Sequence, residues 1–327
     1  MSFVLTDENY YSREADMEYM SCSQFQSFGE CEAKALAKLQ GRWIEEEKEA
    51  FLVGKYFHSY FESKEAHEKF CDEHFDNIYK TKEITVQKKT KDAPAVKETV
   101  ITGKYAPYEM ADKMIQVAEN DPTIKRFIQM EGNCEQFMVG DIFGFPWRMK
   151  MDKYMPQSRM IVDYKTVANI YETKYDSEKG ERVTFVEMYG YIFRAAVYSM
   201  IECQNVNGES FQSVYNKLKD GSLSLPNFIL ICISKQDYPD KELVRLNHRQ
   251  AYVYELEKLK DKLHHYQMIK EGRTLPKRCG TCDYCRATKK ITGIKPYYEL
   301  KPEFRTNLEE DYAINERETV AETQTQE

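Results

Sequence analysis

The sequence has no uninterrupted apolar stretch of the roughly 20 residues that a helix needs to cross a bilayer. Its opening residues, MSFVLTDENYYSREAD, contain neither the basic block nor the apolar block of a secretory signal peptide. We therefore expect a cytoplasmic protein that does not associate with membranes.

Loops that bind nucleotide phosphates are also absent. Neither GxGxxG nor a Walker-type GxxxxGKS or GxxxxGKT occurs, so ATP-driven chemistry within this chain is not expected. Basic residues do not predominate, because 47 Lys and Arg are outnumbered by 54 Asp and Glu and the net charge is −7. This balance argues against a generally basic coat for nucleic acid. It does not exclude DNA as a substrate of an enzyme that confines its cations to one groove.

The chain of 327 residues, 42% of them hydrophobic, is long enough for one large domain or two ordinary ones. The spacing of apolar residues predicts an alternation of helices and strands that is typical of an α/β fold. Helical patterns cover residues 19–39, 45–63, 107–129, 182–203 and 249–272, and strand patterns cover residues 135–166 and 227–235.

Composition divides the chain into four parts. Residues 82–106 are rich in Lys, Thr and β-branched residues around a Pro, which predicts a mobile insertion or a hairpin arm. Residues 301–327 are acidic and short of core residues, a composition typical of a disordered tail. We expect a helical region over 1–50, a core over 51–275 that carries the insertion, a cysteine-bearing segment over 276–300, and then the tail.

Residues 143–167, FGFPWRMKMDKYMPQSRMIVDYKTV, form a pattern of two strands joined by a Pro-containing turn. Antiparallel pairing about the middle of that turn would place Asp152 opposite Asp163 and Lys150 opposite Lys165. Two carboxylates and two cations would then meet on one patch of sheet.

Carboxylates that face each other repel unless a cation lies between them. Hard oxygen ligands suit Mg²⁺ or Mn²⁺, and Lys165 would be placed to orient or deprotonate a water beside a phosphate. The alternative is an ordinary half-exposed hairpin with a cross-strand salt bridge. Acid-x-Lys also occurs at Glu32-Ala33-Lys34, where a solvated helix face is expected.

Three short motifs follow one another along the chain: Gly54-Lys-Tyr-Phe-His58, Asp152, and Asp163-Tyr164-Lys165. In this order they resemble the PD-(D/E)xK nuclease superfamily, and within it the RecB-like and exodeoxyribonuclease VIII (RecE)-like phage exonucleases. The resemblance implies a restriction-endonuclease-like core, in which helices flank a mixed central sheet.

The resemblance also implies roles for these residues. Asp152, Asp163 and the Tyr164 carbonyl would bind Mg²⁺, His58 would be a ligand on the metal or phosphate side, and Lys165 would activate water. Taken without the resemblance, a lone histidine among aromatic residues such as His58 is more often a core or surface residue.

RecB-like nucleases usually carry QxxxY on the helix after the catalytic strand, where it helps to hold DNA. Here Tyr191-Ile-Phe-Arg194-Ala-Ala-Val-Tyr198 places Arg where Gln is expected. Arg194 could contact a phosphate, whereas Tyr191 and Tyr198 could equally be core aromatics. The candidates for contact with DNA are Arg194, Tyr198, Lys150 and Arg148.

The nine cysteines are expected to be thiols in a cytoplasm. Cys279-Gly-Thr-Cys282-Asp-Tyr-Cys285 matches the tight spacing of iron–sulfur proteins better than the paired spacing of zinc ribbons. Since no cysteine follows Cys285, a fourth ligand must come from elsewhere, and Cys31 is a better candidate than Cys22.

AddB-type and CRISPR-adaptation nucleases hold a [4Fe–4S] cluster with one early cysteine and three late ones, and the present order resembles theirs. The gap between the last two cysteines is shorter here than is usual in those proteins. A Zn²⁺ site that uses His264 or His265 therefore stays open as the alternative.

The resemblance implies a Mg²⁺-dependent exonuclease, encoded by a phage and acting in a bacterial cytoplasm. It would resect the ends of linear double-stranded DNA for a single-strand-annealing partner, and it would form a homo-oligomer. The alternatives are a catalytically inactive DNA-binding module and an iron–sulfur or zinc structural subunit of a recombination complex.

Overall fold

The computed structural model describes residues 3–86, 96–177, 180–291, 293–294 and 296–297. The acidic tail predicted over 301–327 lies outside these residues and stays a prediction. None of the described helices is both long enough and apolar enough to cross a membrane.

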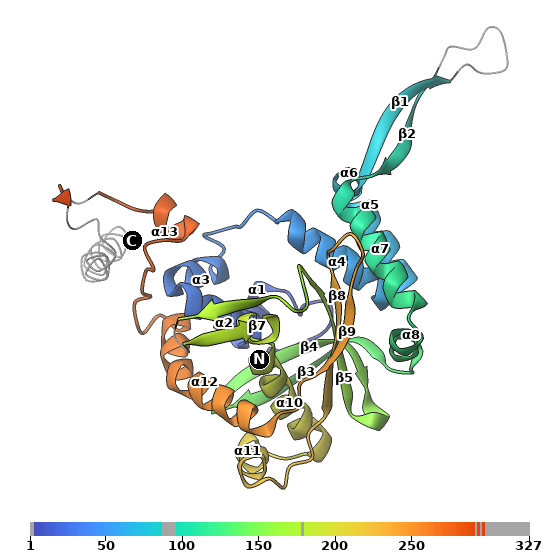
Figure 1. The fold of residues 1–327 in the computed structure, drawn as a ribbon. Coiled ribbons are helices and arrows are strands. Elements are labelled where there is room, and N and C mark those ends of the chain that lie inside the picture. The colour runs from blue at the N-terminus through green and yellow to red at the C-terminus, as the bar shows by residue number, and fades with distance from the viewer. Residues whose placement is uncertain (1–2, 87–95, 178–179, 292, 295, 298–327) are drawn as a thin grey trace.

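A five-stranded mixed sheet forms the centre of the molecule, in the order β3-β4-β5-β8-β9 (Figure 1). β5 and β8 are parallel, and the other neighbouring pairs are antiparallel. The expected α/β fold with a mixed sheet flanked by helices is therefore confirmed. The strands are β3 (Asn133–Ile142), β4 (Phe145–Met155), β5 (Met160–Val167), β8 (Asn227–Ser234) and β9 (Lys241–Arg245).

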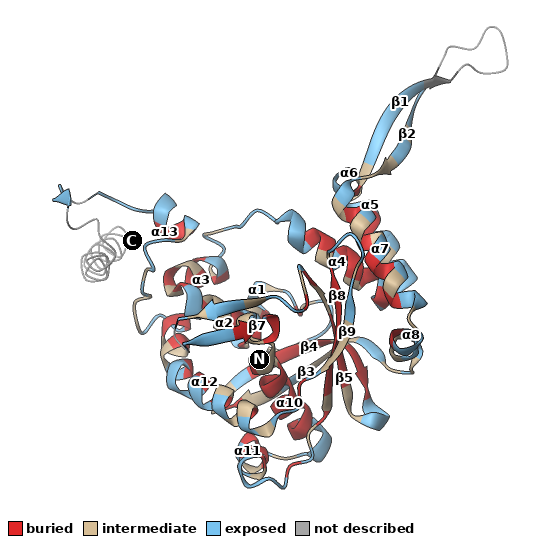
Figure 2. Cartoon of the chain, in the orientation of Figure 1, coloured by how far each residue is buried: buried red, intermediate tan, exposed pale blue. Residues whose placement is uncertain are grey.

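Helices cover both faces of this sheet, so each central strand feeds two separate hydrophobic cores. Along β8, Leu230 packs in the core on one side and Ile231 in the core on the other. The strand is therefore a continuous apolar run, buried from Phe228 to Ser234. Figure 2 shows the buried strands between the helix layers.

The first core lies under α2 (Cys22–Glu30), α3 (Glu32–Leu39), α10 (Tyr191–Asn207), α11 (Phe211–Asp220) and α12 (Arg249–Lys270). The second lies under α4 (Glu49–Glu62), α5 (Lys64–Glu73), α7 (Ala106–Asn120) and α8 (Pro122–Gln129). The shorter helices are α1 (Arg13–Glu18), α6 (Phe75–Ile78), α9 (Phe185–Met188) and α13 (Asp283–Ala287).

Some helices predicted as continuous are divided, and local chemistry explains the breaks. The pattern over 107–129 breaks at Asp121, because Pro122 begins a new helix and the Asp121 carboxylate accepts hydrogen bonds from Thr123 and Ile124. The pattern over 182–203 was wrong in its first part. Residues 181–184 form strand β7, and α10 begins only after Gly190, whose φ is +66°.

The Lys- and Thr-rich insertion contains a hairpin arm that projects from the body (Figure 1), formed by β1 (Tyr79–Val86) and β2 (Val96–Lys104). The hairpin alternative is thus confirmed for the described residues. A second small hairpin pairs β6 (Thr173–Asp176) with β7 (Glu181–Thr184).

The register predicted between β4 and β5 is also confirmed. Lys153 pairs with Val162, and Met155 pairs with Met160. The turn is a short 3₁₀ segment, Pro156–Ser158, followed by Arg159 in the left-handed region at φ 46°. The pairing ends at Lys153, one residue short of Asp152, and this early end shapes the candidate site.

Candidate active site and cysteine cluster

Asp152 lies where β4 and β5 begin to separate. Its Oδ2 accepts a hydrogen bond of 2.8 Å from the backbone N–H of Tyr164. The side chain thus takes the place of the backbone carbonyl that would accept this hydrogen bond if the two strands were still paired. The same oxygen lies 3.2 Å from Nδ1 of His58. Burial acts to raise the pKa of Asp152, but the charges of His58 and Lys165 outweigh it and hold that pKa below its usual value.

His58 reaches this point because its helix is anchored by aromatic packing. On α4, Phe57 and Phe61 are buried in the second core, and the Phe61 ring stacks on Tyr164 with the ring centroids 5.0 Å apart. The His58 ring lies edge-on to the Tyr164 ring, with the centroids 6.2 Å apart, and its Nδ1 faces Asp152. The predicted neighbourhood of His58 and Asp152 is therefore present in the structure.

Asp163 is 3% exposed and lies on the face of β5 toward α10. Its carboxylate forms an ion pair with Lys165, and its Oδ1 lies 3.4 Å from Nη1 of Arg194. Lys165 Nζ also donates a hydrogen bond of 3.0 Å to the Tyr164 carbonyl. One ammonium group therefore contacts two of the oxygen groups that were predicted to bind a metal.

The two aspartates do not face each other as the hairpin pattern predicted. Because the strands separate beyond Lys153, Asp152 turns to Tyr164 N–H and His58, while Asp163 turns to Lys165 and Arg194. The expected pairing of the two lysines was also wrong. Lys150 pairs with Phe137 on β3 and Lys165 with Cys232 on β8.

The four candidates for DNA contact differ in their surroundings. Arg148 is buried, forms an ion pair with Asp16 and packs over the Tyr10 ring. Tyr198 is buried, and its hydroxyl donates to the Lys150 carbonyl at 3.0 Å. These two have partners within the chain, and they line the same cavity as Lys150 and Arg194, so their contact with DNA stays a prediction. The side chains of Lys150 and Arg194 remain 16% and 27% exposed.

Sequence patterns missed Glu135, which lies on β3 opposite Asp152 with a left-handed φ of 51°. Burial and the neighbouring Asp152 raise the pKa of Glu135, and its carboxylate lies 3.3 Å from Lys150 Nζ. No motif marks it, because an isolated glutamate in the left-handed region has no reliable sequence signal.

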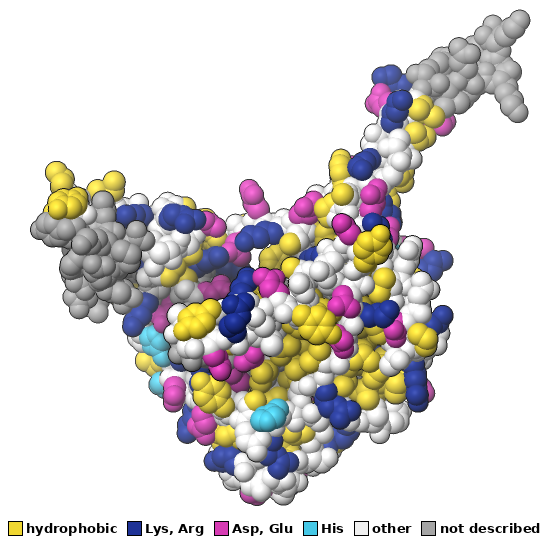
Figure 3. Space-filling model, viewed as in Figure 1, with side chains coloured by type: hydrophobic (Ala, Val, Ile, Leu, Met, Phe, Trp, Pro, Cys, Tyr) yellow, Lys and Arg dark blue, Asp and Glu magenta, His cyan; other side chains and the backbone are white. Residues whose placement is uncertain are grey.

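A cavity of about 450 Å³ borders Arg194 on the side of the first core. Cations and hydroxyl groups line it, and N-terminal residues that the motifs did not single out close one side. Its lining includes Tyr10, Tyr11, Ser21, Lys38, Lys150 and Arg194. Over the face shown in Figure 3, Lys and Arg are interspersed with Asp and Glu and form no single basic surface.

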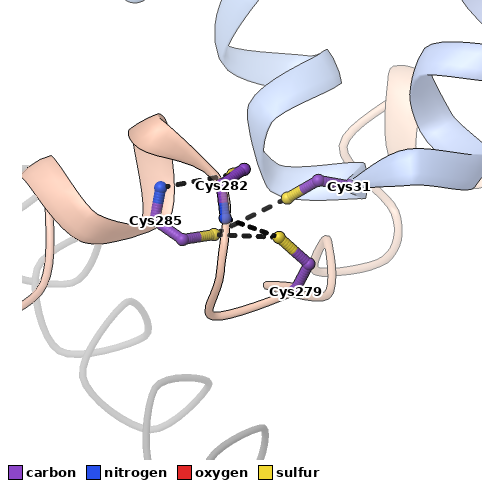
Figure 4. Close-up of side chains that lie close together, drawn as sticks. All are labelled: Cys31, Cys279, Cys282 and Cys285. Atoms are coloured by element: carbon purple, nitrogen blue, oxygen red, sulfur yellow. Dashed lines mark hydrogen bonds between the residues drawn. The ribbon is translucent and has the colours of Figure 1, made fainter.

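The four predicted cysteine ligands meet in space (Figure 4). Cys31 stands between α2 and α3, whereas Cys279, Cys282 and Cys285 come from the C-terminal segment. Among the described residues, these four form the one group of at least three His, Cys, Asp or Glu side chains placed to hold a metal ion. Cys22 instead packs in the first core, so Cys31 is confirmed as the fourth member.

The histidines proposed for the alternative site lie elsewhere. His265 Nε2 lies 2.9 Å from Oε1 of Glu32, and the His264 ring lies beside Phe145. Neither belongs to the cysteine group, so the geometry does not support a zinc site that uses a histidine. A site formed by the four cysteines alone can bind a metal.

The central sheet, together with His58, Asp152, Asp163 and Lys165 around one strand junction, defines a protein of the PD-(D/E)xK nuclease superfamily. Residues 21–288 match the model of a family described as a PDDEXK-like domain of unknown function (DUF3799), and the chain belongs to that family.

A crystal structure from Eubacterium rectale, described as that of a "putative exonuclease", is similar to this chain. It shares 28% sequence identity, superposes with a TM-score of 0.73, and the match covers 92% of this chain and 99% of that one. No curated protein sequence matches this chain.

Proposed function

We propose that the protein is a Mg²⁺-dependent deoxyribonuclease that resects linear double-stranded DNA from its ends. The observation that carries this proposal is the contact of Lys165 with both the Asp163 carboxylate and the Tyr164 carbonyl, beside the pair formed by Asp152 and His58. The family and the similar structure support a nuclease, and the description of that structure supports action from ends.

The residue types suit a hard divalent cation, but in the described part of the chain their ligand atoms are not gathered in one group as those of the four cysteines are. Two carboxylates and a carbonyl supply oxygen donors, and the buried Oδ2 of Asp163 forms an ion pair with Lys165. We propose that Asp152, Asp163, the Tyr164 carbonyl and His58 hold Mg²⁺ or Mn²⁺. When bound there, such an ion supplies Lewis acidity that stabilises charge developing on a phosphodiester.

The chain's own residues would orient the reaction. The Lys165 ammonium lies at the oxygen donors, where it can hold a water molecule against a phosphate. His58 fixes the Asp152 carboxylate from α4, and Arg194 fixes the Asp163 carboxylate from α10. The two carboxylates are thus oriented by helices on opposite faces of the sheet.

The biological setting is also a proposal. We propose RecB-like or RecE-like kinship, a phage origin, a site of action in the bacterial cytoplasm, a homo-oligomeric state and a single-strand-annealing partner. These follow from the resemblance of the motifs. The division at residues 50, 275 and 300 likewise stays a prediction.

The test is degradation of end-labelled linear double-stranded DNA with Mg²⁺, with closed circular DNA as a parallel substrate. We expect wild type to digest linear DNA, to spare circles and to stop when Mg²⁺ is chelated, and we expect Lys165→Ala to be inactive. Lys125→Ala, which changes an exposed lysine on α8, is the matched control and should stay active.

Equal activity of wild type and Lys165→Ala would remove Lys165 from the active site. If wild type binds linear DNA but cleaves none with Mg²⁺ or Mn²⁺, the protein is instead the inactive DNA-binding module or structural subunit.

A further inference from the structure

The four cysteine sulfur atoms are close together. They all lie within 4.8 Å of one another, Sγ of Cys31 is 3.6 Å from that of Cys285, and Sγ of Cys279 is 3.9 Å from that of Cys285. Figure 4 shows the sulfur atoms of Cys31, Cys279 and Cys285 turned toward one another, with Cys282 beside them. These separations can be compared with those that each kind of metal group requires.

A tetrahedral zinc ion with Zn–S bonds of about 2.3 Å places its sulfur ligands about 3.8 Å apart. In a [4Fe–4S] cluster each thiolate binds a different iron. The four thiolate sulfur atoms are therefore farther apart than those around a single zinc ion, by about the distance between two irons. The separations of 3.6 and 3.9 Å match the single ion. We infer that this site holds one tetrahedral zinc ion bound by Cys31, Cys279, Cys282 and Cys285, and not the [4Fe–4S] cluster that the resemblance implies.

The backbone around the C-terminal cysteines is arranged to stabilise thiolates, as metal ligation requires. The Cys282 N–H lies 3.3 Å from Sγ of Cys279, and the Cys285 N–H lies 3.4 Å from Sγ of Cys282. Each Cys-x₂-Cys step therefore folds back on the preceding sulfur. Gly280, at φ +72°, supplies the left-handed residue of the first tight turn.

The surroundings indicate a structural ion. Four protein ligands leave no open position for water or substrate, which is the coordination of structural zinc. Cys31 and Cys285 are buried in a small cluster with Ala33, Ala37 and Tyr284 that is separate from the two main cores. A cluster of this size buries little apolar surface, so a metal ion would supply most of the attachment.

The segment held by this ion is the one that leads from α12 to α13. Next to the cysteines, the Ala33 N–H donates to the Lys277 carbonyl at 3.0 Å, and the Lys277 N–H donates to Glu32 Oε2 at 2.7 Å. These contacts bring the C-terminal segment against the start of α3. The ion would fasten this junction between parts of the chain that are far apart in sequence.

The test is elemental analysis of protein purified without oxygen and without added metal chelators. We expect one zinc per chain, no acid-labile sulfide and no broad absorption in the visible range. Four irons and four sulfides per chain with a brown colour would overturn the inference, and so would a folded protein that contains no metal.

Variants locate the ion. Cys31→Ser should lose the zinc, whereas Cys134→Ser, which changes an exposed cysteine outside the group, should keep it. Because Cys31→Ser could fail to fold, wild type exchanged with Co²⁺ provides a second measurement. Intense ligand-field bands together with thiolate charge-transfer bands are expected of tetrahedral sulfur ligation, and weak bands typical of six oxygen ligands would overturn it. These readouts do not depend on nuclease activity.

Discussion

Replacing Arg159 with Met is expected to lower the free energy of unfolding by about 3 kcal/mol. Arg159 ends the turn between β4 and β5. Its Nε donates to Glu202 Oε1 at 2.9 Å, and its Nη1 donates to the Ser224 carbonyl at 3.0 Å. Glu202 lies on α10 and is 0% exposed, and it also accepts a hydrogen bond of 2.9 Å from the Tyr154 hydroxyl. The substitution would leave this carboxylate buried with one partner.

The magnitude follows from the burial of the two charges. Removing one member of a buried ion pair typically costs about 3 to 5 kcal/mol, because the remaining charge stays out of water. The Arg159 side chain is 23% exposed, so water can partly replace it, and we expect the lower end of that range. Against a total stability of about 5 to 15 kcal/mol for ordinary proteins, this loss is large.

Urea unfolding of wild type, Arg159→Met, Glu202→Gln and the double variant measures the effect. Because glutamine removes the buried charge, the double variant should recover part of the stability lost in Arg159→Met. Arg126→Met, at an exposed position on α8, is the control. A loss under about 1 kcal/mol for Arg159→Met, as for exposed pairs, would refute the reasoning, and so would a double variant no more stable than the single one.

Three further substitutions test the candidate active site and the helix that borders it. The pKa of Asp152 lies below its usual value, so the charged carboxylate stabilises the fold above about pH 4. This contribution is lost as the pH falls toward the lowered pKa. Asp152→Asn should therefore flatten the dependence of the unfolding free energy on pH below about 4. Arg194→Gln should keep more DNA-cleaving activity than Arg194→Glu. The glutamate would place a third carboxylate beside the site, and the site would then bind a phosphate more weakly. Equal rates for the two variants in the digestion assay would contradict this. Gly190→Ala should lower the unfolding free energy by about 1 to 2 kcal/mol, since an L-residue is strained at φ +66°, and an unchanged urea midpoint would contradict it.

Sequence patterns predicted the strand pairing that carries the site, because a local turn sets that pairing. The turn around 156–159 fixes the register of β4 and β5, whereas His58 reaches Asp152 through the packing of α4 in the second core. The breaks at Pro122 and Gly190 are also local, but the predicted helices ran across both residues.

The direction in which each carboxylate turns could not be predicted in this way. It depends on where the ladder between β4 and β5 ends, and no residue type marks that point. Asp152 takes the freed N–H of Tyr164, and Asp163 meets Arg194 from a helix whose start had been predicted too early. The left-handed backbone of Glu135 likewise has no sequence signal.

The cysteine site and the candidate active site are held by different parts of the fold. His58 is fixed by the second core and Asp163 by α10, whereas the cysteines join α3 to the C-terminal segment through a small cluster of their own. Loss of the ion should therefore loosen that segment first and leave the geometry around Lys165 intact. After zinc is chelated, we expect proteases to cut near residues 277–288 while the remaining core stays folded. Cleavage that began instead at α4 or α10 would show that the two sites are coupled.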